Sequence, residues 1–181
     1  MPMHHRDKIP TLRTTRLKLR AFREGDLDPY AAIVADPDVT RHLGDGRPLD
    51  RADAWRQMAI FNGHWMLRGF GIWAVEHRES GELMGRIGCF HPEGWPAFEI
   101  GYVLGKRFWG GGYATEGAAA ALAFARTECH PDRIVSLIRP DNAGSIRVAE
   151  RLGGTLEETI DFFGGRSLVY EYSRGDDRMI G

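Results

Sequence analysis

The sequence has little of what marks secreted, membrane-bound or disulfide-stabilised proteins. Its two cysteines, Cys89 and Cys129, are too far apart for a Cys-x-x-Cys pair, so we expect reduced structural thiols. No apolar run is long enough to cross a bilayer, and residues 1–6 lack the apolar stretch of a signal peptide. These absences predict a cytoplasmic protein that does not bind membranes.

Charge of one sign and metal-ligand spacing are also missing. The formal net charge of -1 gives no electrostatic basis for binding nucleic acid. The seven histidines are scattered without ligand spacing, which predicts no metal site. We find no repeat and no low-complexity linker. The sequence therefore predicts a single domain over residues 1–181, with residues 1–10 as a flexible tail.

The common nucleotide-binding loops are absent as well, although one glycine-rich stretch stands out. Three glycines, Gly110 to Gly112, interrupt the sequence between residues 99 and 116. No Lys-Ser or Lys-Thr follows them, which excludes a Walker A loop. Thr115 stands where the third glycine of a dinucleotide-binding motif would be. This stretch must therefore be interpreted from its own chemistry.

The flanks of the glycines predict a strand, a turn and a helix. Alternating apolar side chains precede the turn, and an alanine-rich segment, residues 114–126, follows it. Three residues without Cβ let backbone N–H groups approach a ligand, and a helix N-terminus is electropositive. With Arg107 just before the turn, these features predict a phosphate site; the alternative is a plain connector.

The remaining pattern predicts an α+β (mixed α/β) domain. Strands are expected at residues 16–22, 70–76, 83–90, 98–104, 133–138, 155–163 and 166–173. Helices are expected from Asp26 to Pro37, from Arg51 to Leu67 and from Asn142 to Leu152. Short turns favour antiparallel pairing, whereas the strand-helix-strand unit around residues 114–126 implies one parallel pair. We expect a mostly antiparallel sheet of about six or seven strands with helices on both faces.

The motifs, taken in order, resemble a known family. Arg107-x-x-Gly110-x-Gly112-x-Ala114 is similar to the coenzyme-binding motif of the GNAT superfamily of N-acetyltransferases. The preceding Glu-Ile-Gly-Tyr, the following Tyr-Ala-Thr-Glu and the downstream Asn142-x-x-Ser145 also fit. Thr14 to Arg20 and Leu152-Gly153 look most like the RimJ/RimL-type branch, which includes ribosomal-protein alanine acetyltransferases. The resemblance covers nearly the whole chain.

The resemblance implies acetyl coenzyme A as co-substrate and no metal. In this family the central strand separates from its neighbour, and the pantetheine arm fills the gap as a pseudo-strand. The residues of this sequence that the resemblance assigns to coenzyme binding are Tyr102, Val103, Leu104, Arg107, Gly110, Gly111, Gly112, Tyr113, Ala114 and Asn142. Arg147 is added as a helix arginine within reach of the 3′-phosphate; the alternative is a solvated side chain. Asn142 is equally suited to cap the following helix, and both roles can coexist.

Two residues are the catalytic candidates. Glu99 lies at the start of the central strand with its neighbours facing the opposite side, so it is the expected general base. Glu116 is the competing carboxylate, but in the first helical turn it is expected to be structural. Ser145 resembles the serine proposed in this branch as general acid. Ala149 replaces the usual tyrosine, which leaves Ser145, Tyr170 or water as proton source.

The predicted function is direct transfer of an acetyl group from acetyl coenzyme A to a primary amine, without a covalent enzyme intermediate. The alternative is a non-catalytic acyl-coenzyme A binding or sensing module on the same fold. A protein N-terminus, an amino sugar, a polyamine and a free amino acid all remain open as acceptors. A homodimer also remains open as the oligomeric state.

Overall fold

The computed structural model describes residues 9–173, in which strands and helices alternate along the chain. Residues 1–8, most of the predicted tail, lie outside the described part. The strands are β1 (Leu12–Arg13), β2 (Leu17–Arg20), β3 (Ile72–His77), β4 (Leu83–Phe90), β5 (Phe98–Leu104), β6 (Ile134–Ile138), β7 (Gly154–Phe162) and β8 (Gly165–Tyr172). The helices are α1 (Leu27–Val34), α2 (Pro37–Thr40), α3 (Arg51–Arg68), α4 (Tyr113–Phe124) and α5 (Ala143–Arg151).

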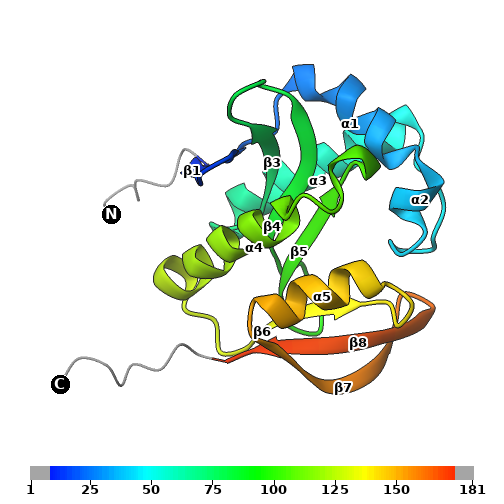
Figure 1. Cartoon of the computed structure of the whole chain (residues 1–181), viewed down its shortest axis with the longest axis vertical. Coiled ribbons are helices and arrows are strands. Elements are labelled where there is room, and N and C mark those ends of the chain that lie inside the picture. The colour runs from blue at the N-terminus through cyan, green and yellow to red at the C-terminus, as the bar shows by residue number, and fades with distance from the viewer. Residues whose placement is uncertain (1–8, 174–181) are drawn as a thin grey trace.

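All eight strands form one sheet in the order β1-β2-β3-β4-β5-β6-β8-β7 (Figure 1). Neighbouring strands are antiparallel except β5 and β6, which are parallel and joined through α4. The predicted mixed, mostly antiparallel sheet with one parallel pair is therefore confirmed. The strand that the sequence did not predict is β1, which is two residues long.

Helices cover both faces of the sheet and bury an apolar core on each. On one face, α1 and α3 pack over β3 and β4, and α4 crosses the opposite face with α5 beside it (Figure 1). The α4 helix lies close to the sheet because its inner residues are small. A Cβ on Gly117 would come within 2.4 Å of Ile87 Cδ1, so any larger residue here would displace the Ile87 side chain.

The helix boundaries follow capping chemistry, with one correction to the sequence prediction. The side chain of Asp50 accepts a hydrogen bond from the Asp53 amide and begins α3. We expected Pro37 to end the first helix, but α1 ends at Val34 and Pro37 begins α2. Proline lacks only the amide that a first helical residue would leave unpaired, and its fixed φ suits a helix start.

A buried ionic network holds β2 to β3 and to the residue that precedes α1. Arg20 and Asp26, 5 % and 6 % exposed, form two hydrogen bonds of 2.7 and 2.8 Å, and Arg20 Nε reaches Glu76 at 2.6 Å. Asp26 was predicted to cap the first helix. Its carboxylate makes no bond of that kind to α1, because it binds Arg20 and the Arg23 amide instead.

We predict that Arg20→Met lowers the free energy of unfolding by about 3–5 kcal/mol, because it leaves the Asp26 charge buried without its partner. Urea denaturation monitored by circular dichroism would measure the change. Arg13→Met is the matched control at an exposed arginine of the neighbouring strand, where we expect a change of about 0.5 kcal/mol or less. Equal losses in the two variants would contradict the role assigned to the network.

Candidate functional site

The main cleft opens where β5 and β6 separate. The two strands pair only at Phe98 with Ile134 and at Glu99 with Val135. At the point of separation, Ser136 Oγ donates to the Ile100 carbonyl at 2.7 Å and bonds the Tyr172 hydroxyl at 2.8 Å. Beyond this point, no described strand pairs with this edge of β5. The resulting cleft has a volume of about 1010 Å³.

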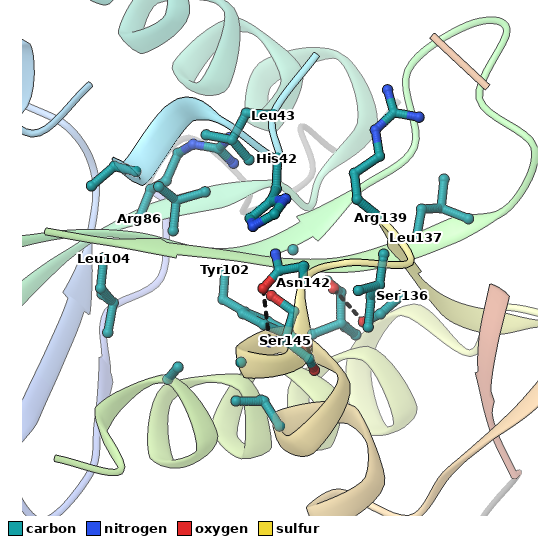
Figure 2. Close-up of a pocket in the computed structure, with 18 of the residues that line it drawn as sticks. His42, Leu43, Arg86, Tyr102, Leu104, Ser136, Leu137, Arg139, Asn142 and Ser145 are labelled. Atoms are coloured by element: carbon teal, nitrogen blue, oxygen red, sulfur yellow. Dashed lines mark hydrogen bonds between the residues drawn. The ribbon is translucent and has the colours of Figure 1, made fainter. Parts of the chain in front are cut away.

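The cleft has two chemically different ends. One end, here the glycine-turn end, is formed by the turn after β5, the N-terminus of α4 and the N-terminus of α5. The other, here the Glu99 end, is lined by Glu99 and a group of aromatic side chains, and Arg86 lines the cleft farther along the sheet, opposite Val103. Figure 2 shows His42 between Arg86 and Arg139, with Asn142 and Ser145 near it. The cleft thus joins backbone donors at one end to charged side chains at the other.

The glycine-turn end is shaped by left-handed backbone. Gly110 has φ +76° and Gly112 has φ +77°, and Gly112 occupies the N-cap position of α4. Both line the cleft, together with Tyr113 and Ala114. At Gly111 the constraint is different, because a Cβ there would come within 2.7 Å of the Tyr113 ring. The glycines therefore fix the path by which β5 enters α4.

Two predicted residues of this turn lie outside the lining of the cleft. The guanidinium of Arg107 forms an ion pair with Glu82 and lies 4.7 Å from the centre of the Phe108 ring. Gly111 directs its carbonyl to Arg16, whose Nη1 donates to it at 2.9 Å. The other residues that the resemblance assigned to coenzyme binding all line the cleft, as do Glu99 and Ser145.

Glu116 anchors the glycine turn to the start of the sheet. Its Oε1 accepts from Thr14 Oγ1 at 2.6 Å and from the Arg16 amide at 2.8 Å, and Oε2 accepts from Arg16 Nε at 2.7 Å. The Arg16 guanidinium also lies 4.2 Å above the Tyr113 ring. Burial would raise the pKa of Glu116, but these hydrogen bonds hold it below its usual value. Among the described residues, the Glu116 carboxylate hydrogen-bonds only groups of residues 14–16, and it does not line the cleft.

The start of α5 borders the cleft between its two ends. Asn142 Oδ1 accepts from the Ser145 amide at 3.1 Å, which is the N-cap bond that the sequence predicted as one of two roles. The Tyr102 hydroxyl donates to the Ser145 carbonyl at 2.9 Å and ties β5 to α5. Ala149 is fully buried in the core, and Tyr170 is buried outside the cleft lining. Of the proposed proton sources, Ser145 is the side chain that lines the cleft.

Glu99 lies among aromatic rings at its end of the cleft. Trp95 Nε1 donates to Glu99 Oε2 at 2.7 Å. Around this bond, Trp95 contacts Phe90, Phe162 and Phe163, with ring centroids 4.9 to 5.2 Å from its own. Burial raises the pKa of Glu99, and the Trp95 hydrogen bond, the charge of Arg86 and the Leu137 backbone limit the rise. A carboxyl group with a raised pKa in a cleft is suited to proton transfer.

Arg139 holds together two segments that border the Glu99 end. Its Nη1 donates to the Phe162 carbonyl at 3.1 Å, and its Nη2 donates to the carbonyls of Gly44 and Phe163 at 3.0 and 3.1 Å. These bonds join residues 41–46 to the β7–β8 hairpin, whose turn residues Phe163 and Gly164 both have positive φ. The nearby His42 Nδ1 lies 3.3 Å from Asp141 Oδ1. The walls of the cleft are thus fixed through backbone contacts.

The sequence did not identify four side chains that line the cleft: His42, Arg86, Trp95 and Arg139. Only Arg86 carried a usable signal, because it interrupts the apolar strand between Leu83 and Phe90. Within residues 9–173, no group of three His, Cys, Asp or Glu side chains is placed to hold a metal ion. In the same range, no helix is both long and apolar enough to cross a membrane.

Comparison with known proteins shows similarity over most of the chain. The acetyltransferase (GNAT) domain family matches residues 16–155. The protein YkkB of Bacillus subtilis is 32% identical over 163 residues, covering 87% of this chain and 92% of YkkB. An acetyltransferase structure from Agrobacterium tumefaciens is 36% identical, with a TM-score of 0.82 over 92% of this chain and 95% of that one. The ribosomal L7/L12 alpha-N-protein acetyltransferase RimL, in complex with coenzyme A, shares the fold at 20% identity, with a TM-score of 0.75 over 90% of this chain and 97% of that one.

We predict that Glu116→Gln destabilises the protein by about 1 kcal/mol at pH 7, a small value because Arg16 is 40% exposed and screened by solvent. The folded-state pKa of Glu116 is depressed, so its ionic contribution is present above the unfolded value of about 4.3. It is lost as the pH falls through the lower folded value. Urea denaturation from pH 7 downwards should show the two proteins converge.

The matched control is Glu24→Gln at an exposed glutamate of the same chain. For this variant we expect little change in the free energy of unfolding at pH 7 or at acid pH. A difference between wild type and Glu116→Gln that persists at acid pH would show that the effect is not the charge of Glu116.

Proposed function

This chain belongs to the GNAT acetyltransferase family, and from that premise we propose that it transfers the acetyl group of acetyl coenzyme A directly to a primary amine. It is an N-acetyltransferase by family, and the proposal concerns the acceptor class, the residues and the absence of a covalent enzyme intermediate. The observation that carries the proposal is the position of Glu99. It is a partly buried carboxylate with a raised pKa in the cleft that begins where β5 and β6 separate.

The chemistry of the cleft fits coenzyme A. The edge of β5 at Tyr102, Val103 and Leu104 has no strand partner among the described residues and offers backbone groups for a pantetheine arm, while the Leu104 carbonyl already accepts from Trp109 Nε1 at 2.8 Å. Gly110 and Gly112 bring backbone close to the position of a pyrophosphate at the N-terminus of α4. The side-chain NH₂ of Asn142 lies on the cleft while its oxygen caps α5. Arg147 lines the same end and supplies a positive charge.

Direct transfer requires that the amine lose a proton before or during attack. We assign this step to Glu99, whose raised pKa keeps it basic enough to accept the proton near neutral pH. The new bond joins the amine nitrogen to the acetyl carbon, and the carbon–sulfur bond breaks. A β5 amide would polarise the carbonyl oxygen. Ser145 or water would then provide the proton or hydrogen bond that the departing sulfur needs.

We predict that Glu99→Gln lowers kcat by about 10²-fold or more, within the usual contribution of a general base. Glutamine keeps the shape and can still accept from Trp95, but it cannot take a proton. Affinity for coenzyme A should stay unchanged. Release of free thiol from acetyl coenzyme A, in the presence of a mixture of primary amines, would measure the rate. Full activity in this variant would exclude Glu99 as the base.

The pH dependence gives a second readout in the same experiment. A carboxyl group is inactive as a base below its pKa, so the raised pKa of Glu99 places the acid limb of the kcat profile above that of an ordinary glutamate. Trp95→Phe removes a hydrogen bond that favours the charged form, so this limb should move to higher pH. In Glu99→Gln the limb should follow only the ionisation of the amine.

Arg107 is proposed to bind a phosphate of the coenzyme, for which its guanidinium must leave Glu82. We predict that Arg107→Ala weakens coenzyme A binding by about 1.5–3 kcal/mol, the range for a hydrogen bond to a charged group. Glu82→Gln frees the same guanidinium and should tighten binding. Isothermal calorimetry would measure both. If neither variant changes the affinity, Arg107 serves only the surface ion pair.

A further inference from the structure

One arginine lines the cleft from the middle of an apolar strand, some distance along the sheet from Glu99. Arg86 belongs to β4, pairs with Val103 of β5 and lines the cleft. Its guanidinium lies 5.0 Å from the centre of the Phe61 ring, which packs against one side of it. An arginine in this position requires compensation, since burying a charge without a partner is costly.

The described part of the chain provides only part of that compensation. The Tyr30 hydroxyl donates to Gln57 Oε1 at 2.7 Å, and burial raises the pKa of Tyr30 while the nearby charge of Arg86 limits the rise. In contrast, Arg86 Nε is buried and has no hydrogen-bond partner among the described residues. No described carboxylate lies within ion-pairing distance of the guanidinium. The Arg86 guanidinium therefore packs against Phe61, and its Nε–H remains available to donate a hydrogen bond to a ligand.

Between Arg86 and Glu99 the floor of the cleft is formed by Gly101 and the side chain of Ile72. In β4, Gly88 lies between Arg86 and Phe90 on one face of the sheet. In β5, Gly101 lies opposite Gly88, between Val103 and Glu99. A Cβ added to Gly101 would meet nothing closer than Ile72 Cδ1 at 4.0 Å. Paired residues of antiparallel strands share a face, so Arg86 and Glu99 project from the same side of the sheet.

The spacing suits a single small molecule with two polar ends. Four residues of strand separate Glu99 from the partner of Arg86, roughly 13 Å along the backbone at about 3.3 Å per residue. The long side chains of both residues shorten the gap between their charged groups. Glu99 is near enough for the charge of Arg86 to affect its pKa. An acceptor lying over Gly101 would thus have an acidic group at one end and a basic group at the other.

We propose that the acceptor is an amino acid-like amine, and that Arg86 binds its carboxylate while Glu99 receives the proton of its amine. This rests on the amine acetylation proposed above. A carboxylate is planar and matches the arginine fork, with Nε and one Nη on the same edge. The Phe61 ring packs against the guanidinium and limits its contact with water, which strengthens the pairing.

The test compares acceptors that differ only in the carboxylate. The pairs are 6-aminohexanoate with 6-aminohexanamide, γ-aminobutyrate with its amide, and phenylalanine with phenylalaninamide. Two dipeptide amides, Ala-Asp and Ala-Asn, distinguish an acidic peptide from a free amino acid. Each is assayed by thiol release from acetyl coenzyme A and product mass. The wild-type enzyme should prefer a carboxylate member by about 10-fold or more in kcat/KM.

Arg86→Gln removes the charge, and its effect must fall on one member of each pair. We expect kcat/KM for the preferred carboxylate to fall by about 10-fold or more, with less than about 3-fold change for the amide. The ratio of variant to wild type cancels any difference in amine basicity. Arg166→Gln is the control, because it removes the same charge at an exposed position of the β7–β8 hairpin and should leave the preference intact. If Arg86→Gln fails to fold, the same ratio of kcat/KM between carboxylate and amide is measured for Arg86→Lys and for the wild type. Equal kcat/KM on both members in the wild type would still reject the inference.

Binding separates this inference from the proposed function. Calorimetry of the wild-type protein saturated with coenzyme A, titrated with the same acceptors, reports recognition without turnover. Carboxylate-selective binding that is lost in Arg86→Gln, without any acetylated product, would support the role of Arg86 and reject the amine transfer. Acetylation of both members of every pair with equal kcat/KM would reject the inference and keep the function. Equal loss on both members in Arg86→Gln would also reject it.

Discussion

The separation of β5 and β6 after two paired residues is the constraint on which the rest of the site depends. Backbone groups at a strand edge must find a partner or face a ligand or water, and here Ser136 satisfies the Ile100 carbonyl at the point of separation. Because the chain leaves β5 through the glycine turn, the free edge and the N-terminus of α4 are adjacent by connectivity. Contacts from distant segments then fix the walls: Glu116 ties the turn to residues 14–16, and Tyr102 ties β5 to α5.

The two ends of the cleft differ in electrostatic character. The glycine-turn end offers backbone amides and a helix N-terminus, both suited to anions. At the Glu99 end a carboxylate lies among aromatic side chains, and Arg86 lines the cleft farther along the sheet. There, burial and hydrogen bonding act on Glu99 in opposite directions, so its basicity is set by a balance of contacts. In this arrangement, the two proposed substrates enter regions of different chemistry and meet near the start of α5.

The features that the sequence predicted are local ones. The strand, glycine turn and helix at residues 98–126, and the Asn142 cap, each depend on residues a few positions apart. Pro37 shows the limit of local rules, since proline suits both the position after a helix and the first position of the next. Arg86 and Arg139 were missed because their roles depend on segments brought together only by folding. Arg139 and Gly44 are 95 residues apart, and a contact with a backbone carbonyl leaves no trace in the partner's residue type.

That last contact bears on how such a cleft can change over evolution. The hydrogen bonds of Arg139 to residues 44, 162 and 163 all end on carbonyl oxygens, which every amino acid possesses. Substitution of the side chains in either segment therefore leaves the attachment intact. One requirement remains at Gly165, where a Cβ would come within 2.7 Å of the arginine. A single cation can thus support two walls whose side chains are free to change, so that acceptor preference could diverge without loss of the frame.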